Sequence, residues 1–134
     1  MSNRKTQAAN IPPPLEEEEQ AALFAWAERA SGAWPELKLL HAIPNGGHRA
    51  KATAAMLKRT GVKAGVPDVM LPVARHGCNG LYIELKRRRG GRLSAEQMAW
   101  MDALMREGFR CAMCRGWDEA RETILQYLGD GSEG

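Results

Sequence analysis

The chain has 134 residues, 44% of them hydrophobic and 26% charged, and a formal net charge of +3. This length and composition predict one globular domain with its own hydrophobic core and argue against a wholly disordered chain. No apolar stretch approaches the roughly 20 residues of a membrane-spanning helix, and residues 1–10 lack the apolar core of a signal peptide. Three cysteines are too few for a disulfide framework. We therefore expect a cytoplasmic protein that binds no membrane.

The charge is distributed unevenly along the chain. Residues 37–115 hold 15 Lys and Arg against 5 Asp and Glu, a net charge of +10, whereas the segments before and after carry −3 and −4. A strongly basic middle in a small domain favours an anionic partner, most commonly nucleic acid. A basic surface that only contacts water is the alternative.

The first half of the chain predicts two helices and one strand. Residues 1–15 are expected to be a tail, since they end near a run of prolines that cannot enter a helix interior. A helix is predicted over 16–30, where acidic residues favour the helix start and apolar residues recur at helical spacing. A strand is predicted over 37–43, closed by a turn at 44–47. A basic helix is expected to follow over 49–60.

The second half predicts strands over 69–73, 81–86 and 109–114, and helices over 94–107 and 117–128. Ser94 and Gln97 fit a capping box at the start of helix 94–107. Helical spacing predicts that this helix buries Met98, Met101, Leu104 and Met105. The mixture of helices and strands predicts a single α/β domain with a mixed central β-sheet flanked by helices.

Two carboxylates and a lysine form the most informative cluster. Glu84 and Lys86 are two residues apart on a predicted strand, so their side chains leave the same face. If strands 69–73 and 81–86 pair as a hairpin, Asp68 converges on Glu84. The two carboxylates and the Leu85 carbonyl then offer hard oxygen ligands that suit Mg²⁺ or Mn²⁺ and not zinc. Lys86 can orient or deprotonate a water beside them. The alternative is an acid in a turn near a surface ion pair.

These residues belong to an ordered set of motifs. The set comprises Glu16 and Gln20, residues 43–47 with Arg49, residues 65–68, Glu84-Leu85-Lys86, Ser94 with Gln97, and Gly108. With these motifs in this order, the chain resembles the VRR-NUC (virus-type replication-repair nuclease) family of the PD-(D/E)xK nuclease superfamily. The resemblance implies a PD-(D/E)xK nuclease-like domain over 16–129, between an N-terminal tail at 1–15 and a C-terminal tail at 130–134.

The resemblance also implies a chemistry. It implies a divalent-metal-dependent enzyme that hydrolyses phosphodiester bonds, with Asp68, Glu84 and the Leu85 carbonyl as metal ligands and Lys86 assisting the attacking water. A first-helix carboxylate often completes such a site, and Glu16 fits the spacing to Gln20 better than Glu19 does. The metal implied is Mg²⁺ or Mn²⁺, with no small-molecule cofactor. The expected setting is the cytoplasm of a bacterial or phage-infected host cell.

Other polar residues have two interpretations each. Gln97 is a capping residue or a site residue, and Gln20 is a site residue or a polar residue at the edge of a helix. Asn45, Gly46 and Gly47 form a turn whose backbone amides can also face a phosphate. The basic residues expected to contact nucleic acid are Arg49, Lys51, Arg87, Arg88, Arg89 and Arg92. A basic loop exposed only to water is the alternative for the last four.

The function expected from these features is a structure-selective DNA endonuclease that acts on branched DNA, such as Holliday junctions, in replication, repair or recombination. Paired cuts in a two-fold symmetric junction need two active sites, so a homodimer is expected. Trp34, Trp100 and Trp117 are the candidate interface residues. The alternatives are a flap, single-strand or nonspecific nuclease, and a non-catalytic DNA-binding subunit.

Overall fold

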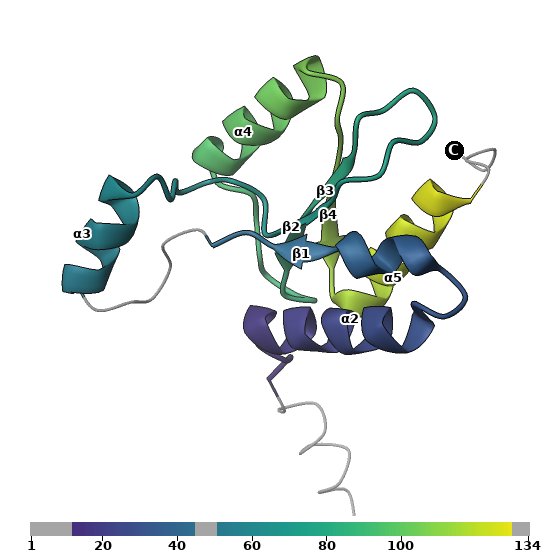
Figure 1. The fold of residues 1–134 in the computed structure, drawn as a ribbon. Helices are drawn as coiled ribbons and strands as arrows, with labels where there is room; N and C mark the ends of the chain where they lie inside the picture. The colour runs from purple at the N-terminus through teal and green to yellow at the C-terminus, as the bar shows by residue number, and fades with distance from the viewer. Residues whose placement is uncertain (1–11, 45–50, 130–134) are drawn as a thin grey trace, which may run out of the picture.

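The computed structural model of the protein describes residues 12–44 and 51–129. In chain order these residues form α2 (Glu16–Ala30), the 3-10 helix η1 (Pro35–Leu39), β1 (His41–Ala42), α3 (Lys51–Arg59), β2 (Val69–Leu71), β3 (Leu81–Lys86), α4 (Ala95–Arg106), β4 (Arg110–Arg115) and α5 (Trp117–Leu128) (Figure 1). The α/β prediction is confirmed. Within the described ranges, no helix is both long enough and apolar enough to cross a membrane.

The four strands form one mixed sheet in the order β1-β2-β3-β4. β1 pairs with β2 and β2 with β3 in antiparallel fashion, whereas β3 and β4 run parallel. The parallel pair follows from the connection between its strands, because α4 crosses over between β3 and β4. β3 is thus a central strand, which agrees with the burial of all its residues except the half-buried Tyr82.

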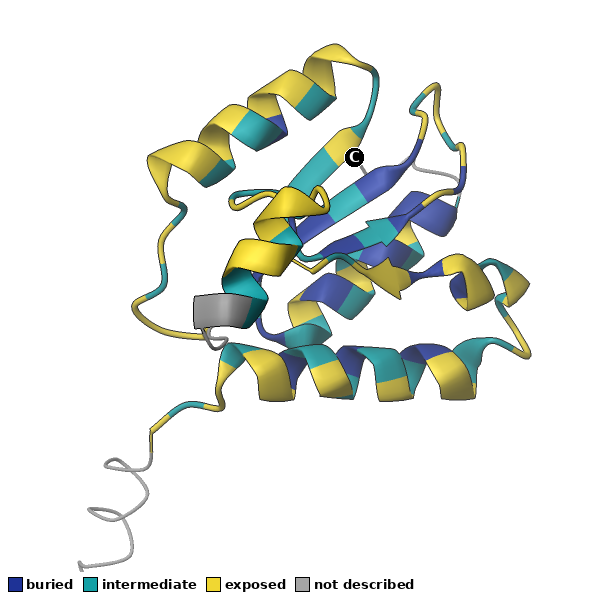
Figure 2. Cartoon of the chain, turned by 60° about the vertical axis from the view of Figure 1, so that its left-hand side comes forward, coloured by how far each residue is buried: buried dark blue, intermediate teal, exposed yellow. Residues whose placement is uncertain are grey.

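Helices α2 and α5 cover one face of the sheet, and α4 lies over the other (Figure 1). Leu81, Ile83 and Leu85 of β3 project into the core between the sheet and helices α2 and α5. Figure 2 shows the matching pattern on α2, whose outward side is exposed and whose sheet side is buried. Full burial of each large apolar side chain contributes about 1.5–3 kcal/mol. This core fixes which side of β3 is left for polar residues.

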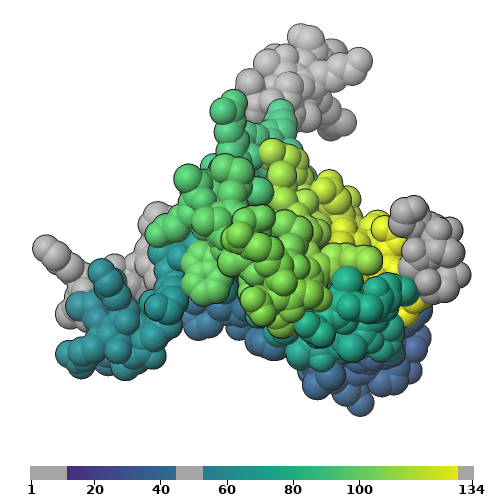
Figure 3. Space-filling model, turned by 90° about the horizontal axis from the view of Figure 1, so that it is seen from above, coloured from purple at the N-terminus to yellow at the C-terminus, as the bar shows by residue number. Residues whose placement is uncertain are grey.

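Helix α4 buries a different stripe from the one predicted. Met101 is 8% exposed, but Met98 and Met105 are 52% and 50% exposed, so the prediction that they are core residues was wrong. Gln97, Trp100, Met101 and Leu104 are the less exposed residues of the helix. The face of β3 toward α4 carries the polar side chain of Glu84. Gln97 therefore turns toward the sheet to bond Glu84, whereas Met98, which the pattern predicted to be buried, faces solvent. Seen from above, α4 lies across the molecule and α3 stands to one side (Figure 3).

Of the segment predicted as strand 37–43, only His41 and Ala42 form a strand, and residues 37–39 belong to the 3-10 helix η1, so most of this prediction was wrong. Pro35 supplies a backbone angle suited to the first helical position. Leu37 and Leu40, one turn apart, are buried, whereas Leu39 is 53% exposed. β1 is reduced to two residues. Residues 49 and 50 of the predicted basic helix, and residues 1–11 and 130–134 of the predicted tails, lie outside the described residues.

Candidate active site

The hairpin of β2 and β3 brings Asp68 to the side of β3. Val69 pairs with Ile83, so Asp68 and Glu84 are the next residues outward along the hairpin. Asp68 Oδ2 accepts a hydrogen bond of 2.8 Å from the Leu85 amide. β2 begins only at Val69, so its backbone pairing with β3 ends before Leu85. The Leu85 amide donates to the Asp68 side chain instead.

Glu84 is a buried carboxylate on the polar face of β3, with 2% of its surface exposed. Its Oε2 accepts a hydrogen bond of 2.9 Å from Gln97 Nε2, and Lys86 Nζ lies 3.5 Å from the same oxygen. Its other oxygen, Oε1, is buried and has no hydrogen-bond partner among the described residues. A buried carboxylate oxygen without a donor is costly, and a bound cation would compensate for it.

The two carboxyl groups disfavour ionisation together. Burial raises the pKa of Glu84 to about 8, the Asp68 charge contributes to the rise, and the Lys86 charge opposes it. The pKa of Asp68 is raised as well, chiefly by burial, although the hydrogen bond from the Leu85 amide opposes the rise. Two neighbouring acids with raised pKa values need a shared proton or a cation between them.

Gln97 has both of the roles that its sequence position allows. Its backbone amide donates to Ser94 Oγ at 3.0 Å, and its side-chain Oε1 accepts from the Ser94 amide at 2.9 Å, which completes the capping box. Its side-chain Nε2 remains for Glu84. The same amide group therefore starts α4 and fixes the orientation of the buried carboxylate.

A cleft of about 630 Å³ opens beside Asp68 between α2 and the end of β3. Glu16 and Gln20 of α2 line it together with Asp68, Leu85 and Arg87. The negative charge of Glu16 is one cause of the raised pKa of Asp68. The structure thus brings the predicted residues of the first helix to the same cleft as the hairpin carboxylate.

The donor set at this edge fits a hard divalent cation with water as additional ligand. Within residues 12–44 and 51–129, no three side chains of His, Cys, Asp or Glu converge closely enough to enclose a metal ion by themselves. Mg²⁺ commonly keeps several waters and binds proteins through one or two carboxylates. Asp68, Glu84 and the main chain at Leu85 meet that requirement, with Glu16 at the cleft wall.

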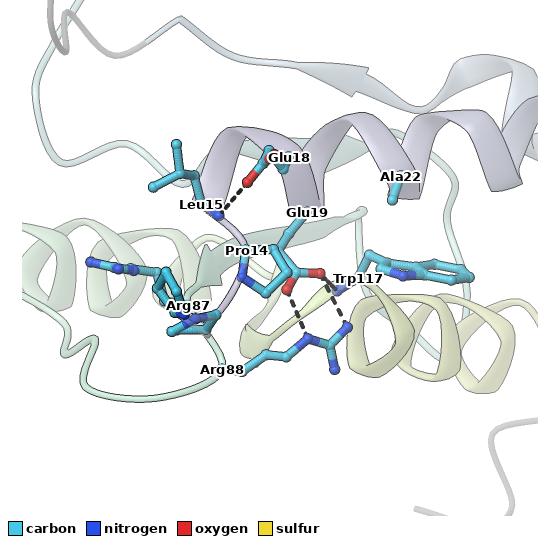
Figure 4. Close-up of a pocket in the computed structure, with 10 residues that line it drawn as sticks. Pro14, Leu15, Glu18, Glu19, Ala22, Arg87, Arg88 and Trp117 are labelled. Atoms are coloured by element: carbon cyan, nitrogen blue, oxygen red, sulfur yellow. Dashed lines mark hydrogen bonds and ion pairs between the residues drawn. The ribbon is translucent and has the colours of Figure 1, made fainter. Parts of the chain in front are cut away.

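Glu19, the second candidate in the first helix, takes part in other contacts. It is buried and bonds Arg88 through both carboxylate oxygens, at 2.8 and 3.2 Å. Its Oε1 also accepts the Trp117 amide at 3.0 Å. These residues border a second pocket, at the start of α2 and α5 (Figure 4). The only sequence signal for this contact was the lack of a capping side chain at Gly116, the residue before α5.

The residues predicted to contact nucleic acid have different surroundings in the structure. Arg87 lines the cleft beside Asp68, and Arg89 and Arg92 are exposed. Arg88 is held by Glu19 and by Asp118, whose Oδ1 lies 3.0 Å from Arg88 Nη1. Lys51 begins α3, and Asn45, Gly46, Gly47 and Arg49 lie outside the described residues.

Comparison with known proteins gives one consistent family. The family model of the VRR-NUC domain matches residues 15–118. A solved structure described as a VRR_NUC domain protein is similar to this chain with a TM-score of 0.72 and 28% sequence identity, over 87% of this chain and 90% of that one. No curated protein matches the chain. The matched region includes the whole candidate site.

Proposed function

Because the chain belongs to the VRR-NUC family of nucleases, we propose that it is a divalent-metal-dependent endodeoxyribonuclease that hydrolyses phosphodiester bonds in branched DNA. The observation that carries this proposal is the buried pair of Asp68 and Glu84. Glu84 Oε1 has no hydrogen-bond partner among the described residues, and both carboxyl groups have raised pKa values. Such a pair is costly for the fold alone and is suited to a cation.

Asp68, Glu84 and the Leu85 carbonyl would hold the cation, and Glu16 would complete the site from the cleft wall on α2 through a bound water. When bound, Mg²⁺ or Mn²⁺ lowers the pKa of a water that it binds and neutralises negative charge on a phosphate. Gln97 keeps Glu84 in one orientation through the 2.9 Å hydrogen bond. Gln20 lines the cleft beside Glu16 and is suited to hydrogen-bond a water or a phosphate oxygen there.

Lys86 would act on the attacking water. Its ammonium lies 3.5 Å from Glu84 Oε2 and is largely buried, so its charge is little screened by solvent. It would orient the water by donating a hydrogen bond from Nζ, and its charge would stabilise the charge that develops on the phosphate. This role predicts that Lys86 affects turnover more than DNA affinity.

The basic residues beside the cleft would bind the DNA backbone. Arg87 lines the cleft itself, and Arg89 and Arg92 are exposed on the loop that follows β3. Their charge would neutralise phosphates on either side of the scissile bond. The proposal extends to Arg49, to Lys51, and to the backbone amides of Asn45, Gly46 and Gly47.

Selectivity for branched DNA such as a Holliday junction would need two active sites at a fixed separation. One domain provides one site, so the proposal includes a two-fold symmetric homodimer. Trp34 and Trp117 pack partly against the core, and Trp100 is half-buried as well, so all three stay candidate interface residues. Light scattering with and without a four-way junction tests this assembly.

Cleavage assays test the proposal directly. Labelled junction, flap, duplex and single-stranded DNA are incubated with the protein in Mg²⁺, in Mn²⁺ or in EDTA. We expect internal cuts in the junction with either metal and none in EDTA. Asp68→Asn and Glu84→Gln should abolish cutting and retain DNA binding. Asp102→Asn, which changes an exposed acid on α4, is the matched control and should cut as the wild type does. Full activity in EDTA, or in both site variants, would overturn the metal-dependent mechanism. Preference for flaps or single strands would instead overturn the junction selectivity.

A further inference from the structure

Glu19 is a buried carboxylate that the proposed chemistry leaves without a role. It is 2% exposed, and its two oxygens accept three hydrogen bonds, two from Arg88 and one from the Trp117 amide. Figure 4 shows Arg88 reaching from the loop after β3 toward Glu19 on α2. The Trp117 amide is at the start of α5, whose N-cap residue Gly116 has no side chain to cap it. Glu19 therefore connects α2, α5 and the loop after β3.

Arg88 is held on several sides at this point. Besides Glu19, it pairs with Asp118 at 3.0 Å. Its guanidinium also packs on Gly116, since a Cβ atom at that glycine would lie 2.7 Å from Arg88 Cζ. The Gly116 amide in turn donates to the Lys86 carbonyl at 3.1 Å. The end of β3 is thereby attached to α5 on both sides of Arg87.

Both partners of this ion pair are close in sequence to residues of the proposed metal site. Glu16 lies three residues before Glu19, hence almost one turn earlier on the same side of α2, and lines the cleft with Asp68. Lys86 lies two residues before Arg88 and is within 3.5 Å of Glu84 Oε2. The pair thus spans the gap between the helix that carries Glu16 and the strand that carries Glu84.

We propose that the Glu19–Arg88 ion pair is a positioning device that holds Glu16 of α2 against the metal-binding end of β3. The inference rests on the proposed metal site. Only Glu19 is buried in this pair, and an ion pair with an exposed partner contributes little to stability, but a bidentate arginine–carboxylate contact fixes distance and orientation. That property is what a ligand on a separate helix requires. Arg88 accordingly acts on the metal site through Glu16 and not through a DNA phosphate.

Calorimetric titration of the DNA-free protein with Mn²⁺ tests the inference. Arg88→Ala should weaken Mn²⁺ binding by about tenfold or more, as loss of groups that orient metal ligands usually does. The Mn²⁺ affinity of Arg88→Lys should lie between that of Arg88→Ala and that of the wild type, because the lysine ammonium keeps the charge but cannot bridge both Glu19 oxygens. Glu19→Gln should also weaken binding. Arg106→Ala, which removes an arginine from the exposed pair with Asp102 on α4, is the matched control and should bind Mn²⁺ as the wild type does.

Two further measurements separate positioning from loss of stability. Ile124→Val, a core change in α5, should lower Tm without changing Mn²⁺ affinity, so a destabilised fold alone does not reproduce the effect. In a Glu16→Gln background, Arg88→Ala should cause no additional loss. If Arg88→Ala fails to fold, Glu19→Gln and Arg88→Lys decide the question.

The possible failures are distinguishable. Wild-type affinity in Arg88→Lys and Glu19→Gln, or a full additional loss in the Glu16→Gln background, would overturn the positioning role while leaving the metal site intact. A wild-type protein that binds no Mn²⁺ would overturn the proposed function itself, and the inference with it.

Discussion

The metal-free protein should lose stability as the pH rises, because Glu84 resists ionisation in the folded state. Burial and the Asp68 charge raise the pKa of Glu84 from an ordinary value of 4.5 to about 8. Between these values the folded protein holds a proton that the unfolded chain has lost, so the free energy of unfolding decreases with pH. The stabilisation is fully present below about pH 4.5 and is lost by about pH 8. One pKa unit corresponds to about 1.4 kcal/mol, so the whole interval corresponds to roughly 4–5 kcal/mol.

Glu84→Gln isolates this contribution. The amide has nearly the same shape, and its oxygen can still accept the hydrogen bond from Gln97. In urea denaturation with EDTA between pH 5 and 9, the variant should lack the decline seen in the wild type and be the more stable protein at pH 8.5. Glu107→Gln, an exposed change at the end of α4, should follow the wild type. Parallel curves for Glu84→Gln and the wild type would refute the reasoning.

Three other predictions follow from single contacts. Gln97→Glu keeps a capping-box partner but places a carboxylate next to Glu84 Oε2, so cleavage in Mg²⁺ should fall about tenfold or more with unchanged helix content by circular dichroism. Replacing Arg87, Arg89 and Arg92 by alanine should reduce the salt dependence of DNA binding by roughly one unit of slope per lost phosphate contact; a wild-type slope would contradict that contact. Gly116→Ala has to adopt φ 87° and displace Arg88, so the free energy of unfolding should fall by about 1–3 kcal/mol; an unchanged Tm would contradict the packing.

The sequence predicted elements whose local signals are strong. The helices at 16–30 and 117–128 and the strand at 81–86 have the predicted bounds. In each case the boundary residues act locally, through acidic residues at a helix start, a glycine after a helix end, or strict alternation along a strand. The mixed sheet and the hairpin geometry of Asp68 and Glu84 followed from these elements. That part of the site was predictable because both carboxylates lie next to or within strands that pair.

The remaining features depend on contacts between distant segments. Glu19 and Arg88 are 69 residues apart in the chain, and no local pattern distinguishes Glu19 from the other three glutamates at the start of α2. The buried stripe of α4 was predicted from its methionines, but Glu84 on the facing strand selects Gln97 instead. Similarly, Pro35 and the burial of Leu37 and Leu40 favour a 3-10 turn over the predicted strand.

The loop between β2 and β3 limits which insertions and deletions the protein tolerates there. Residues 72–80 close the hairpin, with paired backbone hydrogen bonds between Arg75 and Cys78 and one from the Asn79 amide to the Gly108 carbonyl. A longer surface loop usually costs a chain little. Here, however, a one-residue insertion or deletion transmitted to the strands would turn Asp68 to the opposite face of the sheet. A shift of two residues would restore its side but would move Asp68 along β3, away from the Leu85 amide that it bonds. Length variation in this loop is therefore expected only where β2 and β3 keep their register.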